Sequence, residues 1–126
     1  MHPVQWHVAD GKVRATTADE LMYEGTVVPG ASPSAVVPAL RSADAFVLLD
    51  YSKRPQGVEK WHPYRNLMRV APTGDVLWTA ELIPGDMWKC FVGVRISGGL
   101  LIAQGSASEA VIDPDTGAVL DIRHTK

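Results

Sequence analysis

A turn signature that occurs twice constrains the fold of this chain more than any other feature. Residues 70–78 (VAPTGDVLW) and 112–120 (IDPDTGAVL) each run from apolar residues into a Thr-Gly pair and back into apolar residues, about 43 positions apart. Gly74 and Gly117 supply the positive φ that a tight hairpin connection needs. The flanking apolar residues are where two antiparallel strands bury one face. The signature therefore predicts repeated β-hairpins, and it specifies a fold and not a chemistry.

Strand-like segments rich in β-branched and aromatic residues follow one another from residue 65 onward. Gly, Pro, Asp or Ser residues bound each segment, and connections this short favour antiparallel neighbours. This half of the chain is therefore predicted to be a meander. The predicted strands span residues 66–70, 76–82, 90–96, 100–104, 109–112 and 119–123.

The first residues of the N-terminal half predict a further hairpin. An Asp10-Gly11 turn joins predicted strands over residues 4–8 and 13–16. The next stretch has two interpretations. Thr17 to Glu20 has the Thr-x-x-Glu form of a capping box, which would open a helical turn over residues 21–23. A strand over residues 22–28 fits equally well.

Prolines and apolar runs organise the chain between residues 29 and 64. Three prolines and a glycine predict a loop over residues 29–38. One helical turn is expected over residues 39–43. The continuous apolar run over residues 46–49 predicts a buried central strand. Residues 53–64 contain two prolines and several ionisable side chains, so a long exposed connection is expected there.

Length and composition favour a single all-β domain over residues 1–126. A chain of 126 residues with 46% hydrophobic and 21% charged residues can bury a core without metal or disulfide staples. We expect an antiparallel meander of about 8–10 short strands that forms a sandwich, a partly open barrel or propeller-like sheets. At most one or two helical turns are expected.

The repeated hairpins resemble the repeats of quinoprotein-type β-propellers. In those blades a strand with an Asp and a Thr-Gly turn leads into a strand that often ends in Trp. At the second copy here Asp121 occupies the Trp position, a departure from that pattern. Residues 45–126 also resemble a set of small uncharacterised bacterial all-β proteins with the same layout of hairpins. The matching residues are Thr73, Gly74 and Trp78 in the first copy and Asp113, Thr116 and Gly117 in the second.

Chain length argues against a complete propeller. Blades take about 40 to 50 residues and closed rings need at least about four of them, so this chain has room for three at most. The sheet edges must then be covered in another way. A compact sandwich or barrel is one solution, and a homodimer is the other.

Charge and sequence composition limit the partners and the location that we expect. The formal net charge of −2 argues against nucleic acid and anionic membranes as partners. Cys90 is the only cysteine, and its apolar neighbours predict a buried thiol and not a nucleophile. The first residues lack a signal-peptide pattern, and no apolar run reaches the roughly 18 residues of a membrane span. We therefore expect a cytoplasmic protein.

Catalytic and metal sites find little support in the sequence. The four histidines lack the spacing that zinc sites favour, and no cysteine pair accompanies them. Residues 105–108 lack the Gly-x-Ser-x-Gly elbow of serine hydrolases. Asp113 and Asp115 fit a turn-capping role. No catalytic residue, metal site or cofactor is predicted.

The segment from residue 51 to residue 65 is the one stretch that suggests a function. Aromatic faces beside guanidinium or ammonium groups can stack on a base or sugar and pair with a phosphate or carboxylate. The structural alternative is that the aromatic rings cover a sheet edge while the charges are solvated. The candidate binding residues are Tyr51, Lys53, Arg54, Lys60, Trp61, His62, Tyr64 and Arg65.

These observations favour a non-enzymatic binding or protein-interaction module, expected to be a homodimer, that recognises a protein partner or a small anionic ligand. One alternative is a small enzyme or ligand-binding barrel with an apolar cavity, where Arg69, Arg95 or Glu81 would converge. Another is a toxin-neutralising or chaperone-like partner of a basic protein, suggested by small size and mild acidity.

Overall fold

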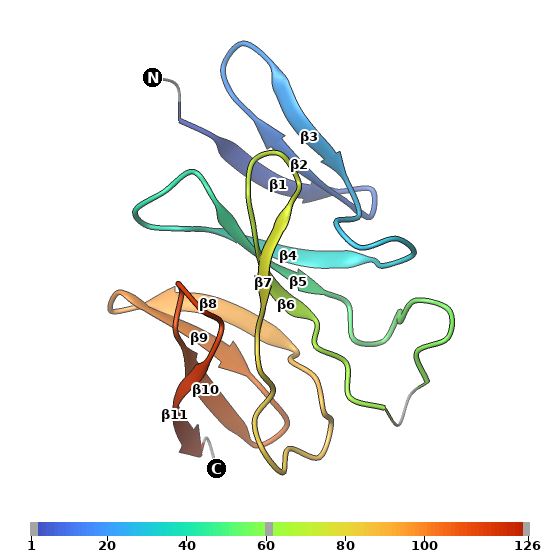
Figure 1. Ribbon diagram of the computed structural model, residues 1–126, viewed down its shortest axis with the longest axis vertical. Helices are drawn as coiled ribbons and strands as arrows, with labels where there is room; N and C mark the ends of the chain where they lie inside the picture. The colour runs from blue at the N-terminus through green and yellow to red at the C-terminus, as the bar shows by residue number, and fades with distance from the viewer. Residues whose placement is uncertain (1–2, 60–61, 125–126) are drawn as a thin grey trace.

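The computed structural model describes residues 3–59 and 62–124, which form three antiparallel sheets stacked as layers (Figure 1). Within those residues there are eleven strands and no helix, so no helix of the described chain could cross a membrane. The all-β antiparallel prediction is confirmed, with slightly more strands than expected and no closed barrel. The first sheet contains β1 (Gln5–Ala9), β2 (Lys12–Thr16) and β3 (Leu21–Gly25). The second sheet contains β4 (Pro33–Pro38), β5 (Ala45–Leu49), β6 (Leu67–Val70) and β7 (Val76–Thr79). The third sheet contains β8 (Gly93–Ser97), β9 (Leu100–Gln104), β10 (Ser108–Ile112) and β11 (Val119–His124).

Strand β5 lies at the centre of the molecule, and all five of its residues are buried. Because successive side chains of a strand point to opposite faces, β5 contributes to two separate cores. Val47 and Leu49 pack with the first sheet around Trp6 and Val13. Phe46 and Leu48 point to the other face of β5 and pack with residues of the third sheet. The predicted central strand over residues 46–49 is thus confirmed.

The two Thr-Gly turns join neighbouring sheets. Gly74, between β6 and β7, lies against the ring of Tyr23 in the first sheet, and a Cβ at this position would overlap that ring. Gly117, between β10 and β11, lies against Trp78 of β7, and a Cβ there would lie 2.7 Å from Trp78 Cε3. Both glycines also have positive φ. Each turn therefore packs on an aromatic residue in the last strand of the preceding sheet.

A buried amide connects the central sheet to the segment that leads into the third sheet. Asn66 is fully buried just before β6. Its Nδ2 donates to the carbonyl oxygens of Leu49 (2.8 Å) and Phe91 (2.7 Å), and its Oδ1 accepts a hydrogen bond from the Phe91 amide at 2.8 Å. The side chain thus fixes the end of β5 beside the residues that precede β8.

Two predictions for the N-terminal half are wrong. The predicted loop over residues 29–38 contains the strand β4, with Pro33 and Pro38 at its ends. Prolines are tolerated there because β4 is an edge strand that pairs only with β5, so their missing N–H groups interrupt no second ladder. The helical turn expected over residues 39–43 is also absent. Instead, the Ala39 amide donates to the carbonyl of Asp44 and closes the connection to β5.

The other N-terminal elements agree with one of the predicted alternatives. The hairpin around Asp10 and Gly11 is confirmed, since β1 pairs with β2 in antiparallel register. Residues 21–25 form the strand β3 and not a helical turn. Thr17 Oγ1 does accept a hydrogen bond from the Glu20 amide, at 3.3 Å, but this contact closes a turn before the strand.

Replacing Asn66 by Ala should lower the free energy of unfolding by about 3 kcal/mol or more, because three buried backbone groups lose their partner and each costs about 1–3 kcal/mol. Urea denaturation followed by fluorescence measures this loss. The variant Gln56→Ala, which removes an exposed amide side chain, is the control and should change stability by less than about 0.5 kcal/mol. If the two substitutions lowered the free energy of unfolding equally, the Asn66 amide would not be what joins the two segments.

Gly74→Ala and Gly117→Ala should each destabilise the protein more than Gly85→Ala does. Gly85 also has positive φ, but a Cβ there meets nothing within 4 Å, so its substitution costs only the backbone term of about 1–2 kcal/mol. At the two Thr-Gly turns overpacking against Tyr23 or Trp78 adds about 1–3 kcal/mol. Thermal unfolding of the three variants provides the comparison, and similar melting temperatures would show that the turns do not join the sheets.

Candidate functional site

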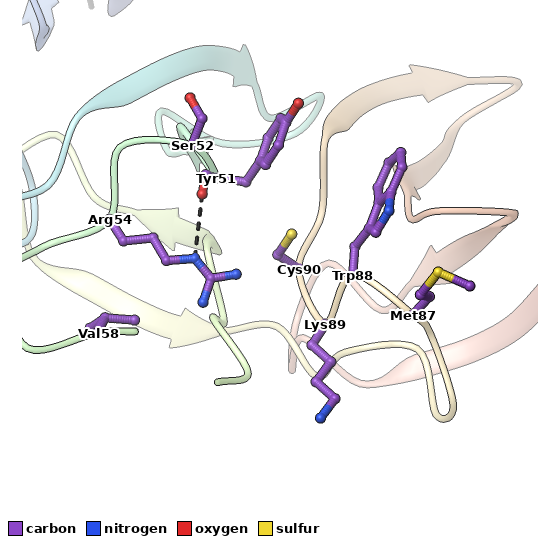
Figure 2. Close-up of a pocket in the computed structure, with 8 residues that line it drawn as sticks. All are labelled: Tyr51, Ser52, Arg54, Val58, Met87, Trp88, Lys89 and Cys90. Atoms are coloured by element: carbon purple, nitrogen blue, oxygen red, sulfur yellow. Dashed lines mark hydrogen bonds between the residues drawn. The ribbon is translucent and has the colours of Figure 1, made fainter. Parts of the chain in front are cut away.

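A cleft of about 950 Å³ lies between the segment that follows β5 and the segment that precedes β8 (Figure 2). Asn66 holds the two walls together, because its amide binds the carbonyls of both Leu49 and Phe91. The Tyr64 amide adds a second link by donating to the carbonyl of Lys89 at 2.8 Å. The cleft is lined by Tyr51, Ser52, Arg54, Val58, Met87, Trp88, Lys89 and Cys90.

Two half-exposed aromatic rings stand on opposite walls of this cleft. Tyr51 is 48% exposed and Trp88 is 47% exposed, and the neighbouring Met87 is 82% exposed. The two ring planes are nearly parallel, at 4°, and their centroids lie 6.4 Å apart. Figure 2 shows the rings side by side, with Cys90 below them. Large apolar side chains exposed together in a cleft are typical of a binding surface.

A short Asp-centred turn orients each ring. Asp50 Oδ1 accepts hydrogen bonds from the amide and the hydroxyl of Ser52, at 2.9 and 2.6 Å, and so holds the turn that carries Tyr51. These bonds stabilise the ionised carboxyl and lower the pKa of Asp50. On the other wall Asp86 Oδ2 accepts a hydrogen bond from the Trp88 amide at 3.2 Å. Both aromatic residues therefore sit on constrained backbone.

Arg54 supports the wall that carries Tyr51. Its Nη1 donates to the carbonyls of Glu59 and His62, at 2.7 and 2.6 Å, and its Nε donates to the carbonyl of Tyr51 at 3.4 Å. The guanidinium also lies 5.4 Å from the centroid of the Tyr64 ring, within the range of a cation–π contact. The arginine thus gives shape to the loop while it contributes positive charge to the cleft.

Cys90 lies at the base of the cleft and is 3% exposed, as its apolar neighbours predicted. Burial raises the pKa of its thiol, and the nearby Arg54 guanidinium only partly offsets that effect. The group is therefore a thiol at neutral pH and not the thiolate that a nucleophile or metal ligand requires.

The structure brings together only part of the predicted binding segment. Tyr51 and Arg54 line the cleft, whereas Lys53 and His62 are exposed outside its lining. Tyr64 is buried beneath Arg54. Arg65 is not among the residues that line the cleft, and it donates hydrogen bonds to the carbonyls of Thr79 and Ala80. The remaining two candidates, Lys60 and Trp61, lie outside the described residues.

Sequence reasoning missed the second wall. The predicted strand over residues 90–96 includes only Cys90 of this wall, whereas residues 87–90 all line the cleft and belong to no strand. The signal that could have found them is the Asp-x-Trp spacing of Asp86 and Trp88, which repeats the turn chemistry of Asp50 and Ser52. The contact between the two walls depends on Asn66, which no local pattern reveals.

The polar groups proposed for a ligand-binding barrel do not converge. Arg69 pairs with Asp44 at 2.8 Å and donates to the carbonyl of Pro114, beside a separate cleft of about 460 Å³. Glu81 accepts a hydrogen bond from the Val119 amide. Arg95 pairs with an acidic residue on the exposed face of the third sheet. Each side chain is thus engaged in its own structural contact.

No family model matches the sequence, and no curated protein matches it. The resemblance to propeller repeats stays an interpretation of the sequence. The chemistry of the cleft must therefore be derived from its own geometry.

Proposed function

We propose that this chain is a non-enzymatic binding module whose cleft, between residues 51–58 and 87–90, takes a small anionic ligand. The observation that carries the proposal is the pairing of exposed aromatic rings with basic groups in one cleft. Among the eight described residues that line it, Arg54 and Lys89 are basic and none is acidic. Such a surface attracts an anion and offers apolar area for the rest of the ligand.

The state of the titratable groups supports binding over catalysis. Arg54 is held by backbone carbonyls, and the Cys90 thiol is kept protonated by burial. A general acid, base or nucleophile needs a pKa near the working pH and a free path to the substrate. The Cys90 thiol does not meet that requirement, whereas the positive charge that Arg54 holds in place suits recognition of an anion. We also propose that the protein is cytoplasmic, as its sequence predicts.

Nuclear magnetic resonance of the ¹⁵N-labelled protein tests the proposal directly. Small organic acids should shift the amide signals of residues 51–54 and 87–90, and the corresponding amines should not. Trp88→Ala should reduce these shifts, while Leu77→Ala, which also truncates an exposed apolar residue, should leave them unchanged. Acids that shift only signals elsewhere, or no acid shifting any signal, would overturn the assignment of this cleft.

We also propose that the chain forms a homodimer through the edge of the third sheet. Strand β11 pairs only with β10, and it borders a groove of about 520 Å³ that Leu82 and Pro84 line together with β11 itself. Leu120 on this strand is 62% exposed. An unprotected edge with apolar side chains is a natural surface for a second copy.

Light scattering coupled to size exclusion should give a dimer mass for the native protein and a monomer mass for Leu120→Lys. The variant Met22→Lys places the same charge on an exposed apolar position of the first sheet and should remain dimeric. A native monomer at high micromolar concentration would refute the dimer.

A further inference from the structure

We propose that the anion taken by the cleft is an acidic side chain in an exposed peptide segment of a partner protein, and that Lys89 recognises it between apolar residues of that segment. This inference rests on the proposed function, because the acidic group would occupy the same cleft, and it names the molecule that presents the anion. It comes from the backbone and charge of Lys89 and from a second hollow that meets the cleft at this residue.

Lys89 stands where the backbone conformation disfavours a side chain. Its φ is 53°, in the left-handed region that glycine adopts without steric cost. The Tyr64 amide donates to the Lys89 carbonyl at 2.8 Å and holds this conformation. Within the described residues the Lys89 ammonium group has no ion pair, whereas Nε and Nη1 of Arg54 are bonded to carbonyls. Residues held in this region cluster at ligand-binding sites, which favours a recognition role for Lys89.

The rings of Tyr51 and Trp88 provide apolar surface in the cleft beside this charge. Their centroid distance of 6.4 Å and their angle of 4° lie in the range of offset stacking, so the rings pack directly on one another. About half of each residue remains exposed, and the neighbouring Met87 is largely exposed. A methionine adapts to apolar groups of different shape. Figure 2 shows the Lys89 side chain extending away from the rings, so this surface lies to one side of the charge.

A second hollow, of about 510 Å³, meets the cleft, since Met87 and Lys89 line both. Its acidic residue, Asp86, is already engaged. Asp86 Oδ1 accepts hydrogen bonds from the amide and the hydroxyl of Ser106, at 2.9 and 2.8 Å, and Oδ2 accepts one from the Trp88 amide. The rest of this hollow is therefore an apolar surface on the other side of Lys89. Its apolar lining residues are Pro63, Leu82, Ile83 and Pro84.

A carboxylate bound by Lys89 would thus have apolar surface on both sides. In an extended chain, side chains two residues apart point to the same face and lie about 7 Å from one another. A segment of the form apolar-x-acidic-x-apolar therefore presents side chains in the order of the cleft, Lys89 and the second hollow. A fatty acid matches only half of this arrangement, because its carboxylate stands at one end. The charge and the two apolar surfaces together favour a peptide segment as the occupant.

Nuclear magnetic resonance titration with the peptide acetyl-Leu-Ser-Glu-Ser-Leu-amide tests the inference. The amide signals of residues 51–54 and 87–90 should shift together with those of residues 82–83 and 85–86. Two half-peptides, in which one or the other leucine is replaced by serine, should each bind about 10-fold more weakly, because each loses the burial of one leucine side chain. The same peptide with lysine in place of glutamate should not bind.

Substitutions test the role of Lys89. Lys89→Gln should weaken binding of the full peptide by about 10-fold or more, because the carboxylate loses its charged partner, and Lys89→Arg should retain most of the affinity. Lys53→Gln is the matched control, since it removes the same charge from an exposed position outside the lining of both hollows. It should change the affinity by less than about 2-fold. Equal weakening by Lys53→Gln and Lys89→Gln would refute recognition by Lys89.

The failure of this inference can be told from the failure of the proposed function. If succinate and octanoate bind the cleft as tightly as the full peptide, the peptide segment is refuted and the anion site stands. If neither these acids nor the peptide shifts the signals of residues 51–54 and 87–90, both are refuted. Equal binding of the lysine-centred peptide would also refute the inference, because the acidic side chain would then play no part.

Discussion

The buried amide of Asn66 is the interaction on which the rest of this structure depends. Both of its N–H groups and its oxygen are bonded to backbone atoms of two segments that are distant in sequence, at Leu49 and at Phe91. A primary amide can donate two hydrogen bonds, and both are used here. The cost of leaving these groups unpaired, about 1–3 kcal/mol each, makes any separation of the two segments unfavourable. The same bonds that join the central and third sheets therefore also set the width of the cleft.

The repeated Thr-Gly turns have a related role, since they determine how the sheets stack. Each turn brings a glycine against an aromatic side chain of the preceding sheet, Tyr23 for the first turn and Trp78 for the second. Trp78 thus belongs to one copy of the sequence signature and receives the turn of the next copy. At the equivalent place in the third sheet stands Asp121, which is exposed and caps the Ile122 amide. In this fold each Thr-Gly turn therefore packs one sheet against the sheet that precedes it.

Elements with a strong local pattern could be predicted from the sequence, and elements with a mixed pattern could not. The buried run of β5 and the hairpin at Asp10-Gly11 were found because hydrophobicity and turn chemistry agree there. Strand β4 was missed because its terminal prolines signal a loop, although they are harmless on an edge strand. For the site, Tyr51 and Arg54 were identified from composition alone. Trp88 was not, because its proximity to Tyr51 arises from tertiary contacts.

The loop that carries Arg54 can hold its own shape and still offer a positive charge to a ligand. Arg54 satisfies carbonyls of its own loop with Nε and Nη1, so the loop keeps its shape without a bound anion. The charge of the guanidinium remains in the cleft while its geometry is already fixed. Because the wall is already ordered, binding costs little conformational entropy there, and the attraction between the guanidinium and an anion adds directly to affinity. The exposed rings of Tyr51 and Trp88 can then supply apolar contact on two walls that the buried amide links.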